Sequence, residues 1–367
     1  MEHKFTPKIR EILTRHYPKN ADEVFEKSHL IQYLNKKTKS ASRGSKARGS
    51  FANLYAIYVL VEDYINKGYL DSENDYSDSE GAVYTEIFTR MRQLPFAKKL
   101  QNHALNSRMN EEFRKFFPDV SHLPIIRDLK TKRYWINQNI LNIGLKEGVV
   151  NISNTVIDIV NAYVEAKRSA FDNFISYTTK LAQISVDEAE KAIAFINQQI
   201  QPNVDARIFE IVSYAILKSH YFDKVIYWGW EPEELNQDKL ILYKTGRTNA
   251  NDGGIDFVMK PLGRFFQVTE TLDFNKYFLD IDKIQRYPIT FVIKTEMDED
   301  EIYRHMEENA VATYSIKAVV KRYMESIEEI INTQKLRQIF EEQVRLGKVK
   351  NIMDEIVIQS RVEFNYE

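Results

Sequence analysis

The hydrophobic pattern of this chain changes at Pro202, and no other sequence feature constrains the fold as much. Before Pro202 the apolar residues recur mainly at helical spacing, and the segment Asn53–Asn66 is apolar on nearly every side. Such a helix is typical of a domain centre, because none of its faces suits contact with water. After Pro202 helical segments alternate with short apolar runs, a pattern that favours an α/β domain.

This change of pattern predicts two domains, which agrees with a length of 367 residues at the usual ~150 residues per domain. The first, residues 1–200, is expected to be helical. The second, residues 201–367, is expected to begin with a helix over Asp205–His220 and to be mainly helical over Lys317–Arg345. Between these helices we expect five strands: Val225–Trp230, Leu240–Lys244, Ile255–Lys260, Arg264–Thr271 and Ile289–Lys294.

Composition excludes several classes of protein. The chain is 43% hydrophobic and 12% aromatic, which argues against wholesale disorder. It has no cysteine, so disulfide scaffolds, thiol catalysis and cysteine zinc sites are excluded. The longest purely apolar run, Leu54–Val61, is far shorter than the ~20 residues of a membrane helix, and the N-terminus has no secretory signal pattern. We therefore expect a soluble cytoplasmic protein.

Positive charge is concentrated in the first part of the chain. Residues 1–150 contain 25 Lys and Arg against 18 Asp and Glu, whereas the whole chain has a net charge of -2. Six of these cations fall between positions 36 and 48 with no acid among them, interleaved with Ser, Thr and Gly that can also contact phosphate. The alternative is a solvated loop. The DNA-binding candidates here are Lys36, Lys37, Lys39, Arg43, Lys46 and Arg48.

A second polar segment, around Asn102 and His103, carries side chains that can read base edges. A plain surface helix is the favoured interpretation of this segment. The seven histidines include no pair at i, i+4, which argues against a zinc site, and the chain has neither a P-loop nor a dinucleotide-binding fingerprint.

Oxygen-bearing side chains gather in the segment between residues 251 and 271. Asp256 lies just inside an apolar run behind Gly253 and Gly254. If the following hairpin is centred on Leu262, Asp256 lies opposite Val268, between the neighbours Gln267 and Thr269. Hard divalent cations such as Mg²⁺ prefer oxygen ligands, so the spacing favours a metal site. The structural alternatives are a turn-capping Asp256 and ordinary sheet residues at positions 267 and 269.

The order of these residues resembles the PD-(D/E)XK nuclease superfamily, and within it the type II and Mrr-like restriction endonucleases. Their pattern is a helix with a Glu, a strand with Gly-Gly-Ile-Asp, and a strand with Glu or Gln two residues before a Lys. Here Glu210 lies on the helix, Gly253–Asp256 matches the first strand and Gln267–Thr269 the second. The resemblance implies a C-terminal α/β/α domain with a mixed sheet, catalytic residues Asp256, Gln267, Thr269 and Glu210, and Mg²⁺ held by Asp256, Glu210 and Gln267. A solvated helix position is the alternative for Glu210.

One position departs from the family pattern, because Thr269 stands where the lysine is expected. Lys276 and Lys283 follow on the next segment and are candidates to replace it. Glu270 becomes a second acid of the site if a bulge shifts the strand by one residue.

The resemblance and the basic run together predict a type II restriction endonuclease. Such an enzyme hydrolyses double-stranded DNA with Mg²⁺ at a specific sequence of plain or modified bases, commonly as a homodimer because each strand needs an active site. The helical domain would bind DNA and the α/β domain would cleave it. Two other readings stay open: a DNA-binding protein whose nuclease-like domain is inactive, which Thr269 favours, and a helical interaction module of phage defence that targets RNA.

Overall fold

The computed structural model describes residues 2–41, 47–71, 76–98, 100–183, 189–245, 255–270 and 272–364. The chain forms two compact units, Met1–Ala170 and Phe171–Glu367. The division falls within the long helix α8 (Ser153–Ala182), which is earlier in the chain than the boundary at residue 200 expected from the sequence.

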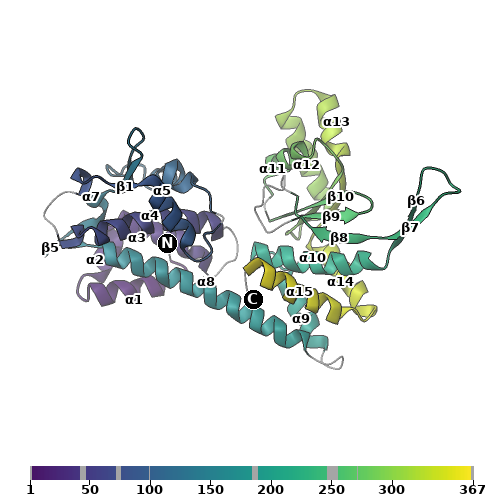
Figure 1. The fold of residues 1–367 in the computed structure, drawn as a ribbon, viewed down its shortest axis with the longest axis horizontal. Helices are drawn as coiled ribbons and strands as arrows, with labels where there is room; N and C mark the ends of the chain where they lie inside the picture. Colours follow the sequence, from purple (N-terminus) through teal and green to yellow (C-terminus); the bar gives the residue numbers. More distant parts are fainter. Residues whose placement is uncertain are drawn as a thin grey trace. The chain divides into compact units, whose positions relative to one another are not determined.

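The first unit is mainly helical, and it also contains short strands that the sequence pattern did not indicate (Figure 1). Strand β3 lies between β1 and β2 in one small antiparallel sheet, and β4 pairs with β5 in a hairpin. The helices of this unit before α8 are α1 (Thr6–His16), α2 (Ala21–Lys27), α3 (His29–Thr38), α4 (Ala47–Asn66), α5 (Tyr84–Gln93), α6 (Met109–Phe116) and α7 (Gln138–Leu141). The short helical turns are η1 (Lys39–Ala41), η2 (Tyr69–Asp71), η3 (Tyr76–Asp78) and the π-helix η4 (Ala104–Arg108), and the strands are β1 (Ala82–Val83), β2 (Ile125–Asp128), β3 (Arg133–Ile136), β4 (Asn142–Leu145) and β5 (Gly148–Asn151).

Helix α4 is the centre of this unit, as its sequence predicted. Leu54, Tyr55 and Leu60, which lie on three different sides of the helix, are all buried in one large apolar cluster. Burying a side chain of this size contributes about 1.5–3 kcal/mol. The first unit is therefore built around α4, and its other helices and strands surround that core.

The second unit contains the elements of the expected α/β domain. After the end of α8 its helices are α9 (Ala189–Gln199), α10 (Ala206–Phe222), α11 (Phe274–Lys283), α12 (Glu299–Thr313), α13 (Lys317–Glu325), α14 (Thr333–Arg345) and α15 (Val349–Phe364). Its strands are β6 (Val225–Trp228), β7 (Asn236–Lys239), β8 (Ile241–Lys244), β9 (Phe257–Lys260), β10 (Arg264–Thr269), β11 (Ile289–Ile293) and β12 (Ile327–Ile331). The five expected strands are present, with some ends shifted by one or two residues. The segment Lys317–Arg345 is mainly helical, as expected, but strand β12, which the sequence pattern did not indicate, separates its two helices.

The sheet of this unit has five strands in the order β12-β11-β10-β9-β8. Strands β10, β11 and β12 are parallel, and β9 runs antiparallel to β10 and β8, so the sheet is mixed. Helices α11, α12 and α13 pack on one face, whereas α10, α14 and α15 lie on the other (Figure 1). The result is a three-layer α/β/α arrangement with a mixed sheet.

Alternation along β10 decides which residues face which helices. Phe266 packs against Tyr221 of α10, and Phe265 packs against Tyr287 on the opposite side. Because successive strand residues face opposite sides of a sheet, Gln267 lies on the α11 side. Glu270, just beyond the end of β10, is oriented toward the α10 side.

Candidate functional site

The candidate site is built on the β9–β10 hairpin, whose register differs by one residue from the expected one. Met259 pairs with Arg264 and Phe257 pairs with Phe266, so the hairpin is not centred on Leu262. The expectation that Asp256 pairs with Val268 across the hairpin is therefore wrong. The strand pairing of β9 ends at Phe257, and Asp256 lies one residue beyond it, so its side chain can interact with the main chain of β10.

Asp256 and Gln267 meet at the main chain of Val268. The Val268 N–H donates to Asp256 Oδ2 at 2.7 Å, and Gln267 Nε2 donates to the Val268 carbonyl at 3.3 Å. The main chain of Asp256 is itself fixed on both sides, because its N–H donates to the Phe266 carbonyl and its carbonyl accepts from Thr245. The hairpin thus brings together two of the four catalytic residues implied by the resemblance.

The side-chain oxygen of Gln267 is the most unusual atom of this group. Gln267 Oε1 is buried, and no described residue donates a hydrogen bond to it. Buried polar atoms are nearly always satisfied in folded proteins, so an exception of this kind suggests a missing partner. An amide oxygen beside a carboxylate is a donor set that suits Mg²⁺, which binds one or two protein oxygens and keeps several waters.

Thr269, at the lysine position, is buried, and its hydroxyl hydrogen-bonds Tyr277 of α11. Burial raises the pKa of Tyr277, and the bond to Thr269 partly opposes that increase. The Thr269 carbonyl accepts the N–H of Lys294 at 2.9 Å. The side chain at this position is therefore a neutral hydroxyl already engaged with the neighbouring helix.

Glu210 is buried, so the interpretation of a solvated helix position is wrong. Its carboxylate forms an ion pair with Lys244 of β8, with a Glu210 Oε1–Lys244 Nζ distance of 2.8 Å. One turn further along α10, the Tyr214 hydroxyl donates to the Leu242 carbonyl at 3.0 Å, which holds the helix against β8. Lys244 pairs in register with Phe257, the neighbour of Asp256. Helix α10 therefore brings Glu210 to the end of β8 that lies beside the hairpin.

Sequence reasoning missed two lysines at the edge of this site, the half-buried Lys244 and the buried Lys294. Lys294 follows β11, and its Nζ donates to Glu270 Oε2 at 2.9 Å and to the Val204 carbonyl at 2.6 Å. The signal in the sequence was a lysine at the end of each of two apolar strands. Apolar strands rarely end in a buried charge unless a partner is present, and the partners here, Glu210 and Glu270, are distant in sequence.

The lysines that the sequence suggested in place of the missing one lie elsewhere. Lys283 Nζ donates to Asp280 at 2.6 Å within α11, and Lys276 is exposed. In the part of the chain that the structure describes, neither side chain is bonded to the β9–β10 hairpin. Gly253 and Gly254, which precede Asp256 in the motif, lie outside the described residues.

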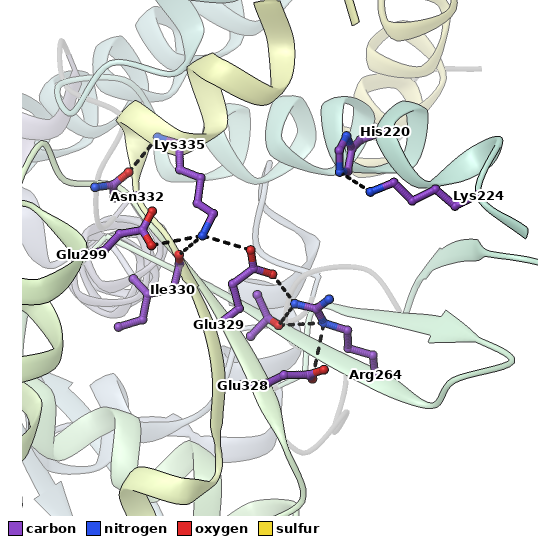
Figure 2. Close-up of polar contacts among 10 residues, drawn as sticks. His220, Lys224, Arg264, Glu299, Glu328, Glu329, Ile330, Asn332 and Lys335 are labelled. Atoms are coloured by element: carbon purple, nitrogen blue, oxygen red, sulfur yellow. Dashed lines mark hydrogen bonds and ion pairs between the residues drawn. The ribbon is translucent and has the colours of Figure 1, made fainter. Parts of the chain in front are cut away.

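A charged layer runs from Arg264, at the beginning of β10, past the middle of β12 to Lys335 in the first turn of α14 (Figure 2). Arg264 of β10 donates to the Thr290 hydroxyl of β11 at 2.7 Å and to Glu329 of β12. Glu329 also accepts from Lys335 of α14 at 3.1 Å, and Lys335 reaches Glu299 of α12 at 3.1 Å. Burial lowers the pKa of Lys335, but the two carboxylates outweigh it and the pKa is raised overall. These charges satisfy one another, so the layer is structural and holds the strands in register.

The basic run of the first unit is only partly available for DNA. Lys36 Nζ lies 4.4 Å from the centre of the Phe116 ring, and Lys39 is exposed on η1. Lys37 Nζ instead forms an ion pair with Glu112 at 2.7 Å. Arg43, Lys46 and the side chain of Arg48 lie outside the described residues.

The second predicted DNA-binding segment lies just before a π-helix. His103 is exposed and Asn102 is half-buried, and the Asn102 carbonyl accepts the N–H of Asn106 in η4 at 3.1 Å. Single-turn π-helices are frequent at functional sites, although the geometry here identifies no ligand.

No protein-family model, no curated protein and no solved structure matches this chain. Within the described ranges, no three His, Asp or Glu side chains are grouped so that they alone could hold a metal ion. No described helix is both long and apolar enough to cross a membrane.

Proposed function

We propose that this chain is a Mg²⁺-dependent deoxyribonuclease of restriction type that hydrolyses double-stranded DNA at a specific sequence. One observation carries the proposal: Asp256 and Gln267 meet at Val268, and the buried oxygen of Gln267 has no donor among the described residues. The α/β/α arrangement supports it, because helix α10, the strand after Asp256 and the strand with Gln267 follow one another in the order of the family pattern.

The proposed chemistry divides among a few side chains. Mg²⁺, when bound, activates a water molecule and neutralises charge on the phosphate. The Asp256 carboxylate and the Gln267 amide oxygen would hold the ion, and Glu210, kept in place by Lys244, would orient a water from the α10 side. Thr269 contributes no positive charge at the position of the family lysine.

Lys294 is the cation that we assign to the charge-stabilising role. Its main chain is bonded to Thr269 at the end of the strand with Gln267, and its Nζ lies with Glu270 on the α10 side, the side from which Glu210 acts. Removal of one positive donor near a reacting phosphate commonly lowers the rate by ~10²–10³. Lys294→Met is expected to do so, and Lys276→Met, at an exposed position of α11, serves as the control.

A second candidate function is DNA binding without catalysis. Two observations favour it: the Thr269 hydroxyl is engaged with Tyr277, and the Glu210 carboxylate is compensated by Lys244. In this case the second unit would be a structural relative of nucleases that has lost hydrolysis.

Cleavage of plasmid DNA with Mg²⁺, with and without EDTA, separates the two functions. The nuclease is expected to cut only with Mg²⁺. Asp256→Ala is expected to abolish cutting while DNA binding stays within a few-fold, because the change removes a metal ligand and no phosphate contact. Asp256→Asn keeps the shape of the side chain and controls for misfolding. Wild-type cleavage by both variants would reject the site, whereas binding without any cleavage by the parent chain would support the second function.

A further inference from the structure

The strands β6 and β7 form an arm that projects away from the five-stranded sheet of their unit (Figure 1). They pair with each other from Val225–Lys239 to Trp228–Asn236. At the tip the chain approaches itself closely, since a Cβ at Gly229 would lie 2.4 Å from the Glu234 carbonyl oxygen. The tip is therefore a defined turn that requires glycine.

This arm exposes large apolar side chains to an unusual degree. Trp230 is 97% exposed and Tyr227 is 64% exposed, and Val225 and Leu235 are also exposed. The stripe continues onto β8, where exposed Ile241 and Tyr243 alternate with the buried Leu240 and Leu242. Contiguous apolar surface of this kind is typical of a contact with another macromolecule.

The charge of the arm excludes nucleic acid and anionic membranes as its natural partners. Residues 225–238 contain four carboxylates and no Lys, Arg or His. Three of them, Glu231, Glu233 and Glu234, are exposed at the tip. A phosphate backbone or an anionic bilayer would be repelled by this group.

The base of the arm has the opposite charge. Lys224, Lys239 and Lys260 are exposed there, and their Nζ atoms lie over the rings of Tyr221, Phe222 and Tyr243 at 4.9, 5.5 and 5.8 Å. Among the described residues, none of these lysines forms an ion pair with a carboxylate. One element thus has an apolar stripe with an acidic end and a basic end.

We propose that the arm binds the same arm of a second copy of this chain, with the two arms antiparallel about a two-fold axis. In that arrangement the acidic tip of one copy lies over the lysines of the other, and both contacts form at once. The apolar stripes, which include Tyr227 and Ile241, are then buried against each other. A single sequence supplies both halves of the complementary charge pattern, which is why a second copy fits better than an unrelated partner.

Dimerisation through the arm does not depend on the proposed nuclease activity. It suits that activity, because an enzyme that cuts both strands of DNA benefits from two active sites. The experiment measures mass alone, so its failure and the failure of the nuclease assay are distinguishable.

Sedimentation of the full chain over a range of concentrations tests the proposal. The parent chain is expected to be a dimer. The tip variant Glu231→Lys, Glu233→Lys, Glu234→Lys and the base variant Lys224→Glu, Lys239→Glu, Lys260→Glu are each expected to weaken self-association on the order of 100-fold or more, since like charges then meet at both ends. An equimolar mixture of the two variants is expected to recover a dimer, because tip and base are again complementary.

A matched charge reversal on α12 and α13, Glu307→Lys, Glu308→Lys, Glu325→Lys, serves as the control and should leave the dimer intact. Trp230→Ser removes an apolar contact without changing any charge, and it should weaken the dimer. It tests the proposal if the charge variants fail to fold. A monomeric parent chain, or a dimer that all arm variants retain, would overturn the proposal. Two arm variants that stay monomeric when mixed would overturn the charge pairing specifically.

Discussion

A buried hydrogen-bond acceptor without a donor costs a folded protein about 1–3 kcal/mol, and Gln267 Oε1 is such an atom in the part of the chain described. Stability alone therefore does not explain a glutamine at this position of β10. Gln343 of α14, a buried glutamine, is a useful contrast. Its Oε1 accepts the Ser219 hydroxyl at 3.0 Å, so it does contribute to stability. Substitution by Leu is therefore expected to have opposite effects on the free energy of unfolding at these two positions.

Gln267→Leu is expected to leave the free energy of unfolding unchanged or to raise it by up to ~1–3 kcal/mol, because it removes an unsatisfied buried polar atom. The same variant should lose Mg²⁺-dependent cleavage. Gln343→Leu should lower the free energy of unfolding by ~1–3 kcal/mol, because it leaves the Ser219 hydroxyl without its partner. Urea denaturation followed by circular dichroism measures both. Equal destabilisation by the two variants would show that Gln267 has a structural role.

At the residue scale, the sequence predicted that Asp256 and Gln267 lie close together, but it did not predict the two lysine pairs beside the hairpin. Asp256 and Gln267 are separated by one short hairpin, so the expected pairing of two adjacent strands was enough to predict that they lie close together. Lys244 and Lys294 have partners 34 and 24 positions away, at Glu210 and Glu270 respectively. No periodic pattern joins residues on different elements at such separations. Only the packing of α10 and β11 against the hairpin reveals these pairs.

At the scale of elements, the sequence predicted the strands that consist of a short apolar run. It did not predict strands such as β12, whose formation depends on contacts with other elements. Strand β12, Ile327–Ile331, contains two glutamates with good helix propensity, yet it pairs in parallel with β11. Its Glu329 is held by Arg264 and Lys335 (Figure 2), so a charge network stabilises a strand that propensity disfavours. The register of the β9–β10 hairpin likewise differs by one residue from a hairpin centred on Leu262. The alternation of side chains along the two strands does not determine the geometry of the turn at residues 261–263.

The junction of α10 with α14 carries a histidine that should make stability depend on pH. Burial lowers the pKa of His220, and the charge of Lys224, whose Nζ lies 2.7 Å from His220 Nε2 (Figure 2), lowers it further. The carboxylates of Glu342 and Glu329 oppose this shift without reversing it. The neutral imidazole is thus favoured in the folded state.

Because the pKa of His220 is lower in the folded chain than in the unfolded chain, the free energy of unfolding depends on pH. The unfolded chain binds a proton on His220 near the ordinary pKa of 6.5, before the folded chain does. The stabilising contribution is therefore fully present above pH 6.5 and is lost as the pH falls through the lowered folded value. Chemical denaturation between pH 7.5 and pH 5 is expected to show a falling free energy of unfolding, and His220→Gln should flatten that slope. His103→Gln, at an exposed position, is the control. A slope that persists unchanged in His220→Gln would assign it to other groups.

At the scale of the whole molecule, the chain combines a basic helical unit with an acidic α/β unit. The length and the change of pattern at Pro202 predicted two parts, but the compact units divide within α8, at Ala170. A helix that continues through a boundary gives no local sequence signal there, because its apolar periodicity is unbroken. The uneven distribution of charge, in contrast, is visible in the sequence alone, and it yields the prediction that depends least on the details of the site.

Binding of DNA by the first unit should depend on salt through a small set of lysines. Each phosphate contact adds about 0.9 to the slope of log K against log salt, so loss of Lys36 and Lys39 by substitution with Gln should reduce the slope by up to ~1.8. The loss should be equal for all DNA sequences, because phosphate contacts do not distinguish bases. Lys37→Gln should instead lower stability and barely affect the slope, since Lys37 is already paired with Glu112. Titration of labelled DNA at several salt concentrations measures all three variants, with exposed Lys317→Gln of the second unit as the control. If the slope of the Lys36 and Lys39 variant equals that of the parent chain, these lysines make no phosphate contact and the basic run is only a solvated surface.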